Sequence, residues 1–533
     1  MCLKEILTEP FEKRPVIMPF TDDLNDTFRK EYGFSLVGRI PELVWETESL
    51  SKARLFYHRH LVERFSEAFG DNVGEWCDRH GIGLTGHMMN EWTLFSSTSA
   101  VGEVMRPLKH FGMPGMDMLC DRRELTTAKQ VQSISHQMGR EGVMSEIYGV
   151  TGWHFDFRRH KLAGDWQAAL GVTFRVPHLT WVSMAGEGKR DYPASIGHQS
   201  PWYKEYKYIE DHFARVNTVM TRGKSEVKIG VIHPIESYWA LFGNRLQTGD
   251  QRESIESRYE ELVSWMLYGL LDFDFISEAV LAEEEAEQRG TDFIAGCMHY
   301  ACVIVPGLLT MRRNTADRLL SFAESGGNVV FLGNVPRYID GDRDDILTTL
   351  EARSKTVAYD RSEILRVLEP YRDIDITVRC ADYVEPKVEL RAHGTRPDNI
   401  FYQMRKEGDK RWLFLCHVNP PETDNITCTE ELNIRVRGEY RVKLLDTLTG
   451  EIAEVFSEVS GGQTRIRAYV SAHSSLLYAL EDISTAGDEK RGDGRYANVC
   501  CPEYREPVIT NVLPEPITYD TDEPNVLLLD TAE

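Results

Sequence analysis

The sequence predicts a multidomain α/β plus β protein with a partial (β/α)8 TIM-type barrel, a doubly wound flavodoxin-like domain and a β-sandwich. Helical and strand patterns alternate over residues 1–225, and again over 228–333 with continuously apolar strands. From about residue 375 the apolar period becomes two. With 533 residues the chain is too long for one core. The segments that we expect are 1–225, 226–345, 346–482, and a linker with the start of a further β domain at 483–533.

The first segment carries short apolar strands separated by amphipathic helices. Helices are expected at residues 51–69, 126–140 and 203–222. Strands are expected at 81–87, 114–119, 171–178 and in the apolar run that begins at Val143. Strand–helix repeats of this spacing are typical of a parallel sheet, most simply of a barrel. We therefore predict that residues 1–225 form the C-terminal portion of a catalytic barrel.

The second segment has strands that are apolar throughout, as a sheet covered by helices on both faces requires. The strands are expected at 228–234, 302–307 and 328–333, with helices at 255–269 and 315–325. Neither GxGxxG nor a P-loop pattern is present, so a bound nucleotide is not expected. Cys297 and His299 raise the alternative of an amidotransferase-type nucleophile. Because no strand-to-helix elbow surrounds them, we expect structural roles for both.

The third segment alternates apolar and polar residues between Gly, Pro, Asn and Asp turns, which predicts a β-sandwich. Its strands are expected at 400–404, 412–416, 440–445 and 474–478. The turn at residues 446–451 is typical of a hairpin. Residues 483–498 are polar and Gly-rich, as in a linker, and 525–530 are apolar strand material.

Composition narrows the class of protein. A net charge of -23 argues against nucleic acid as a partner, because phosphates would be repelled. The ten cysteines are scattered without a CxxC pair, which favours reduced thiols and a cytoplasmic protein. Neither a signal peptide nor an apolar run of membrane-spanning length is found, so no membrane association is expected.

Glu146 is the most informative residue, because it ends the apolar run from Val143 and is followed closely by Gly152 and Trp153. A carboxylate at a strand end beside an aromatic side chain is typical of a barrel enzyme that acts on a sugar. The alternative is a surface glutamate after a core strand. Glycoside hydrolysis needs a second carboxyl group, and Glu9, in Thr8-Glu9-Pro10, is the first candidate. By itself that tripeptide is typical of a surface turn.

Further candidates lie at other strand ends. Glu91 is a third candidate carboxylate, although it could simply begin a helix and favour the helix dipole. His87 is either a sugar contact or a core histidine. Aromatic faces stack on sugar C–H bonds, but a core role is more common for any single Trp. The expected substrate-binding residues are His87, Asp117, Trp153, His178, Arg190 and Trp202.

Several motifs of the first segment together resemble a known family. They are Thr85-Gly86-His87, Pro114-Gly115-Met116-Asp117, Ser145-Glu146 with Gly152-Trp153, Gly171 to His178, Gly188 to Pro193 and Gln199 to Trp202. They resemble the α-L-rhamnosidase-like group of glycoside hydrolase family 106. The layout is similar to that of family 42 β-galactosidases, in which an amidotransferase-like domain and a β-sandwich follow the barrel.

The resemblance implies strand positions and roles. Glu9 would be the acid/base at the end of barrel strand four, with Thr8 where many members have Asn, and Glu146 the second catalytic residue at strand seven. His87, Asp117 and His178 would end strands five, six and eight. The resemblance also implies an inverting reaction and calcium as a cofactor, with no ligands that the sequence identifies.

The leading hypothesis is a glycoside hydrolase that cleaves a terminal α-L-rhamnoside-type sugar with a pair of glutamates, and a β-galactosidase-like enzyme is the second choice. The alternative is a non-catalytic carbohydrate-binding or assembly protein with a decayed barrel. A third, less favoured function is an amidotransferase-like activity of residues 228–340. If Glu9 ends strand four, the chain is expected to be an internal portion of a longer enzyme, inactive or at best weakly active as it stands; the alternative is that a partner chain completes the barrel. An open half barrel would expose apolar surface, so a homo-oligomer or poor solubility is expected.

Overall fold

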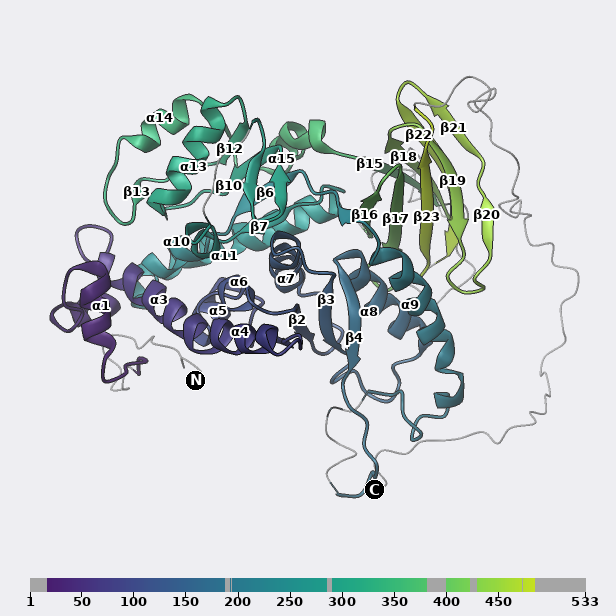
Figure 1. The fold of residues 1–533 in the computed structure, drawn as a ribbon, viewed down its shortest axis with the longest axis horizontal. Helices are drawn as coiled ribbons and strands as arrows, with labels where there is room; N and C mark the ends of the chain where they lie inside the picture. Colours follow the sequence, from purple (N-terminus) through teal and green to yellow (C-terminus); the bar gives the residue numbers. More distant parts are fainter. Residues whose placement is uncertain are drawn as a thin grey trace, which may run out of the picture.

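The chain folds into three packed units, an N-terminal helix-and-sheet unit, an α/β unit and a β-sandwich (Figure 1). The computed structural model describes residues 17–186, 192, 194–284, 290–380, 399–421, 429–471 and 473–484. The structure therefore bears on the first three predicted segments. The predicted fourth segment, 483–533, lies almost entirely outside the described residues.

The N-terminal unit contains a four-stranded sheet in the order β1-β2-β3-β4. The strands are β1 (Thr85–His87), β2 (Met113–Met118), β3 (Val143–Ile147) and β4 (Val172–Pro177), and every neighbouring pair is parallel. Four predicted strands are thus found, in sequence order. The first is shorter than predicted, because Gly81 has a φ of +69°, which no strand residue adopts.

Helices alternate with these strands, as the periodicity predicts. They include α3 (Lys52–Phe65), α4 (Asn72–Arg79), α7 (Leu125–Gln137), α8 (Phe157–Ala169) and α9 (Lys207–Met220). Helix α7 packs against both β2 and β7 (Asp274–Ile276) of the α/β unit, so it is buried on nearly every side. The buried Lys129 of α7 reaches Asp272 with its Nζ atom 2.9 Å from Oδ1.

The α/β unit has a five-stranded parallel sheet in the order β14-β12-β10-β6-β7. Besides β7, its strands are β6 (Ile229–Ile232), β10 (Cys302–Val305), β12 (Asn328–Leu332) and β14 (Lys355–Val357). Numbered along the chain, this is the flavodoxin-like order 2-1-3-4-5. Strands β6 and β10 are buried at every residue, as continuous apolar strands require.

Two details of this unit differ from the expectation. Strand β14 pairs with β12, so the sheet continues past residue 345, where we expected it to end. Helix α11 (Arg245–Tyr268) begins ten residues before the predicted start at 255, after Asn244 caps its first turn. Residues 245–254 are mostly polar and give no apolar period, so the sequence does not reveal this part of the helix. Helix α13 (Arg313–Glu324) lies close to its predicted range.

The sandwich consists of two antiparallel sheets in the orders β15-β18-β22-β21 and β20-β19-β23-β17-β16-β5. The first sheet contains β15 (Ile374–Cys380), β18 (Thr429–Arg437), β21 (Ser457–Ser460) and β22 (Gln463–Ser471). The second contains β5 (Lys224–Ser225), β16 (Ile400–Glu407), β17 (Lys410–His417), β19 (Tyr440–Leu445), β20 (Ile452–Glu454) and β23 (Ser475–Asp482). Side chains of both sheets share one core. The predicted β-sandwich is confirmed, with the hairpin turn at Asp446.

The sandwich packs on helices α8 and α9 of the N-terminal unit (Figure 1). His212 of α9 bridges the two units, with Nε2 2.7 Å from Asp165 Oδ1 and Nδ1 2.8 Å from Thr447 Oγ1. All three side chains are buried. Among the described residues, no helix is both long and apolar enough to cross a membrane.

Candidate active site

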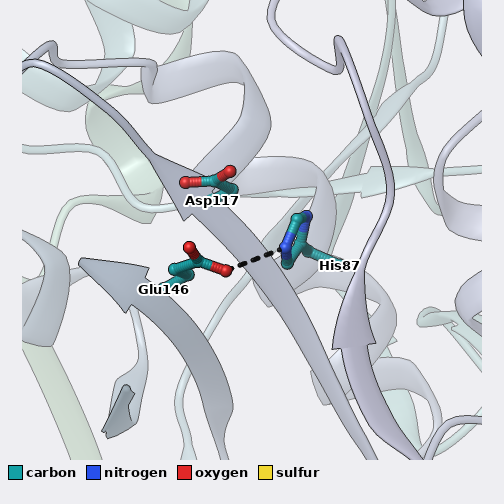
Figure 2. A group of neighbouring side chains, drawn as sticks. All are labelled: His87, Asp117 and Glu146. Atoms are coloured by element: carbon teal, nitrogen blue, oxygen red, sulfur yellow. Dashed lines mark hydrogen bonds and ion pairs between the residues drawn. The ribbon is translucent and has the colours of Figure 1, made fainter. Parts of the chain in front are cut away.

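Three polar side chains meet at the carboxyl ends of adjacent parallel strands of the N-terminal unit. His87 is the last residue of β1, Asp117 lies next to the end of β2 and Glu146 next to the end of β3. In the sheet register, Asp117 stands opposite Glu146. Since parallel strands point the same way, the three residues share one edge of the sheet, where α/β enzymes build their sites. Figure 2 shows the side chains turned toward one another.

The polar atoms of this cluster are close enough to act together. One donor atom from each of His87, Asp117 and Glu146 lies within 4.8 Å of the other two. His87 Nε2 is 3.2 Å from Glu146 Oε2, and His87 Nδ1 is 2.6 Å from the Met88 carbonyl oxygen. A carbonyl can only accept, so Nδ1 carries a hydrogen. The contact between Nε2 and Glu146 is then a hydrogen bond only when one further proton lies between them.

The surroundings favour the charged imidazolium. Burial by itself would lower the pKa of His87, but the Met88 carbonyl and the carboxylates of Asp117, Glu91 and Glu146 raise it above its ordinary value. For Asp117, burial and the neighbouring Glu146 raise the pKa of the carboxyl. Its Oδ1 atom is buried without a hydrogen-bond partner. The cluster thus combines a carboxyl group and an imidazole whose pKa values are both raised above their ordinary values, beside Glu146.

Glu91 lies behind this cluster and does not begin a helix. The next helix, α5 (Leu94–Ala100), starts after Thr93, whose side chain forms a capping box with Ser96. Glu91 is only 4% exposed, and its Oε1 atom has no hydrogen-bond partner. Burial raises the pKa of Glu91 to about 8, although the charge of His87 opposes the shift. Glu91 therefore keeps its proton to a higher pH than an ordinary glutamate, as a proton donor requires.

The backbone is strained where the chain leaves these strands. Non-glycine residues with φ between 51° and 72° follow β1 at Asn90, β2 at Cys120 and Asp121, and β3 at Tyr148 and Val150. Such conformations cost about 1–3 kcal/mol each and cluster at functional sites. Val150 is β-branched, so its conformation is the least favourable of the five. The tertiary structure therefore holds these residues in left-handed backbone conformations that their own conformational preferences disfavour.

The other predicted site residues are placed differently. His178 follows β4, donates its backbone N–H to the Ile147 carbonyl and lowers the pKa of Asp117, so it belongs to the same edge. Trp202 donates its indole N–H to the Ser195 carbonyl at 3.1 Å and packs on Phe157, before helix α9. Trp153 is half-buried in the turn after β3. No contact recorded among the described residues joins either tryptophan to the cluster. Glu9 and Arg190 lie outside the described residues.

Sequence reasoning missed Glu124, which directly precedes helix α7. Burial and the nearby Asp117 raise the pKa of its carboxyl, so Glu124 joins the group of buried acids around the cluster. An acidic residue just before a predicted helix was the available signal, because helix N-termini favour carboxylates. No sequence signal could have revealed the Met88 carbonyl as the acceptor of His87 Nδ1, because a backbone carbonyl is present at every residue and only its direction gives it this role.

The implied calcium does not fit this donor set. Calcium takes six to eight oxygen ligands, whereas the cluster offers one imidazole nitrogen and two carboxylates. Imidazole with carboxylates suits first-row transition metals better. We therefore assign no calcium to the described residues and derive no chemistry from it.

The carboxyl edge of strands β6 and β10 in the α/β unit offers little space for a ligand. The cavity at the carboxyl edge of β6 and β10 has a volume of about 10 Å³ and is lined by Pro234, Arg258, Tyr259, Gly307 and Tyr359, among others. Cys297 occupies the turn between β8 (Phe293–Ala295) and β9 (Met298–Tyr300). A hairpin turn is not the strand-to-helix elbow that a nucleophile of this type requires, in agreement with the sequence.

Comparison with known proteins finds likeness in structure only. No protein-family model matches the sequence, and no curated protein matches it. A rhamnosidase from Novosphingobium sp. PP1Y superimposes with a TM-score of 0.67 at 16% identity, over 90% of this chain and 44% of that one. This chain therefore spans less than half the length of the rhamnosidase.

Two solved structures named as GH42 proteins are also similar. The β-galactosidase Gan42B from G. stearothermophilus gives a TM-score of 0.57 at 11% identity, over 86% of this chain and 75% of that chain. An exo-carrageenase from Bacteroides ovatus gives 0.56 at 11% identity, over 88% and 64%. The chain thus shares the multidomain fold of glycoside hydrolases over most of its described length.

Proposed function

We propose that this chain acts in glycoside hydrolysis, on a terminal neutral or deoxy sugar, with Glu146 as one of the two catalytic carboxyl groups. The observation that carries the proposal is the meeting of His87, Asp117 and Glu146 at the carboxyl ends of three parallel strands. This edge is where barrel enzymes carry their catalytic residues. The shared fold with glycoside hydrolases makes a carbohydrate the substrate to test first.

The chemistry requires one carboxyl group that donates a proton and another that is ionised. In our proposal Glu146 is the ionised group, because a protonated His87 donates to it through Nε2. Glu146 then attacks the anomeric carbon or removes a proton from water. The acid protonates the leaving oxygen. Glu9 is the first candidate for that role, and Glu91, kept neutral by burial, is its replacement.

The proposed architecture explains how Glu9 would reach the site. We propose that β1 to β4 correspond to strands five to eight of a (β/α)8 barrel, and that the strand ending at Glu9 would be strand four. Strand β1 is an edge of the sheet among the described residues, so its outer side is open to such a strand. Carboxyl groups about 5–5.5 Å apart would give retention and about 6.5–9.5 Å inversion, whereas more than about 12 Å would exclude the Glu9–Glu146 pair.

An α-L-rhamnoside is the first substrate that we propose, with a β-galactoside second. The likeness to a rhamnosidase has the higher TM-score, 0.67 against 0.57 for the β-galactosidase. These two sugars differ in the ring substituents that a binding site contacts, so a panel of p-nitrophenyl glycosides separates them.

The test compares two glutamates that lie near the two ends of β3. Glu146→Gln removes the proposed catalytic carboxylate, whereas Glu141→Gln changes an exposed glutamate just before the other end of β3. We expect the first variant to lose roughly a thousandfold or more in kcat, the scale of general acid–base catalysis, and the second to keep its activity. Equal activities in the two variants would contradict the role of Glu146. Sugar binding without any turnover would favour a non-catalytic carbohydrate-binding protein instead.

A further inference from the structure

Arg123, in the loop after β2, connects the site to the sandwich. Arg123 donates from Nε to the Val418 carbonyl at 3.1 Å and from Nη1 to the Asp121 carbonyl at 2.7 Å. Val418 follows strand β17 of the sandwich, and Asp121 lies four residues after Asp117. The guanidinium therefore ties a sandwich peptide group to the backbone of a loop that starts in the site.

The sandwich end of this connection is firmly held. Val418 is fully buried, and its N–H donates to the Asn399 backbone carbonyl at 3.1 Å and to the Asn399 side-chain oxygen at 3.2 Å. The same side-chain oxygen accepts from the Asn419 N–H at 2.6 Å. Asn399 thus fixes the direction of the Val418 carbonyl, which has to point at Arg123.

At the site, the loops after β2, β3 and β4 pack tightly against one another. The Cys120 N–H donates to the Gly149 carbonyl at 3.0 Å, which joins the loop after β2 to the loop after β3. A Cβ atom on Gly149 would lie 3.0 Å from Leu119 Cδ2 and 3.1 Å from His178 Cδ2, so three loops interlock there. Gly149 lies three residues after Glu146 and Cys120 three residues after Asp117. Displacement of either loop would change the distance between these two carboxyl groups.

The chemistry of Arg123 suits a bridge between backbone groups. Its guanidinium lies 3.5 Å from the Asp121 carboxylate, farther than from either carbonyl. A planar fork with several fixed donors can hold two acceptors in one geometry, which a lysine ammonium cannot do as rigidly. The strained residues Cys120 and Asp121 need such support, because their left-handed backbone is unfavourable by itself.

We propose that Arg123 is a positioning residue, through which the β-sandwich holds the loops after β2 and β3 and thereby the spacing of Asp117 and Glu146. In this proposal the sandwich helps to maintain the geometry of the site, in addition to being a separate domain. The catalytic consequence rests on the proposed function, but the mechanical connection does not depend on it.

Hydrogen–deuterium exchange of the full chain tests the connection directly. In Arg123→Ala we expect backbone exchange in residues 119–124 and 148–150 to accelerate roughly tenfold, as loss of a typical hydrogen bond permits. Arg122→Ala, which removes the exposed neighbour in the same loop, should leave both segments unchanged. Arg123→Lys should lie between Arg123→Ala and the unmodified chain. Unchanged exchange in Arg123→Ala, or equal acceleration in Arg122→Ala, would overturn the proposal.

A second variant approaches the connection from the sandwich. Asn399→Ala frees the Val418 peptide group, so we expect it to accelerate exchange in the same two segments although Asn399 belongs to another unit. If both variants act through the Arg123–Val418 bond, the double variant should show no more acceleration than the stronger single one. Full additivity, or no effect of Asn399→Ala outside the sandwich, would count against the proposal.

Steady-state kinetics distinguish a positioning role of Arg123 from a purely structural one, because only a positioning role changes kcat per folded molecule. On a glycoside that the chain hydrolyses, Arg123→Ala should lower kcat roughly tenfold to a hundredfold with little change in KM, because it disturbs reacting groups and not sugar binding. A fall in stability alone would leave kcat per folded molecule unchanged and would contradict the role. If no glycoside is hydrolysed, the proposed function fails, and the exchange results still decide the mechanical connection.

Discussion

His87 Nε2 and Glu146 Oε2 lie 3.2 Å apart, although their strands, β1 and β3, are separated by β2. Adjacent strands are about 4.8 Å apart, so strands two positions apart are separated by roughly twice that distance. The two side chains must therefore lean toward each other over β2, beside Asp117 (Figure 2). The arrangement gives one hydrogen-bonded pair and one adjacent carboxyl, and it leads to the following expectations.

Removal of the imidazole should weaken catalysis more than sugar binding. We expect His87→Ala to lower kcat/KM roughly a hundredfold, since Glu146 loses a charge-assisted hydrogen bond that orients it. The matched control is His80→Ala, which removes an exposed histidine stacked on Trp76 at the end of α4. Steady-state kinetics on the same glycoside compare the two variants. An equal loss in both would mean that His87 has no specific role.

The choice between Glu9 and Glu91 as the acid can be made with leaving groups. Loss of the true acid should reduce turnover roughly a hundredfold to ten-thousandfold on glycosides with poor leaving groups, and much less on 2,4-dinitrophenyl glycosides. We expect Glu9→Gln to show this dependence and Glu91→Gln to lose less than about tenfold on both. If Glu91→Gln shows the leaving-group dependence instead, Glu91 replaces Glu9 as the partner of Glu146.

Glu103 predicts a pH dependence of stability. It is 1% exposed, and burial raises its pKa from the ordinary 4.5 to about 7, although the Ser277 hydroxyl opposes the shift. Between these values the folded protein keeps a proton that the unfolded chain has released. The free energy of unfolding should therefore decrease as pH rises from about 4.5 to about 7 and then level off.

The variant Glu103→Gln isolates this contribution, because the amide is neutral at every pH. The gap between the two pKa values corresponds to roughly 3 kcal/mol, so at pH 8 the variant should be more stable by an amount of that order. Near pH 4.5 the difference should be small. Urea unfolding at both pH values measures it. A stability difference that is the same at pH 4.5 and pH 8 would contradict the assignment.

Cysteine labelling tests our proposal that the α/β unit has no catalytic role. Cys297 is exposed in its hairpin turn, whereas Cys302 and Cys416 are buried, with the pKa of Cys302 raised by burial to about 12. Cys120, in the loop after β2, is exposed as well, so the test uses a Cys120→Ser background, in which a thiol reagent should modify Cys297 and leave glycoside hydrolysis intact. Rapid labelling of Cys297 with loss of activity, prevented in Cys297→Ser, would assign this unit a catalytic role.

Exposed apolar side chains near both edges of the four-stranded sheet predict self-association. Trp76 and Ile82 lie toward the β1 edge, and Phe174 and Val176 lie on β4, with exposures between 38% and 53%. Unpaired parallel strand edges with apolar surface favour association. Sedimentation of the unmodified chain should show oligomers. The double variant Phe174→Lys, Val176→Lys should show a smaller oligomeric fraction. A monodisperse monomer for the unmodified chain would remove this expectation.

The sequence by itself determined the fold in outline, because apolar periodicity is a local property. The strands that carry His87, Asp117 and Glu146 at or near their ends follow from short apolar runs between turn residues, and the change to a period of two marks the sandwich. Where the periodicity was weak, the expectation failed. The first ten residues of α11 are polar, and β14, a three-residue strand mostly exposed, lies beyond the expected boundary at residue 345.

Only the tertiary structure decided which of the predicted site residues meet. The sequence placed His87, Asp117 and Glu146 at strand ends, but their contact depends on the strand order and on side chains that lean over β2. The pKa of Glu91 is raised by burial, and burial depends on segments distant in the chain. The indole N–H of Trp202 donates to the Ser195 carbonyl, within a loop whose sequence has no apolar periodicity from which that contact could be predicted. Local patterns fix the direction and type of each element, whereas distances and dielectric surroundings arise from packing between elements.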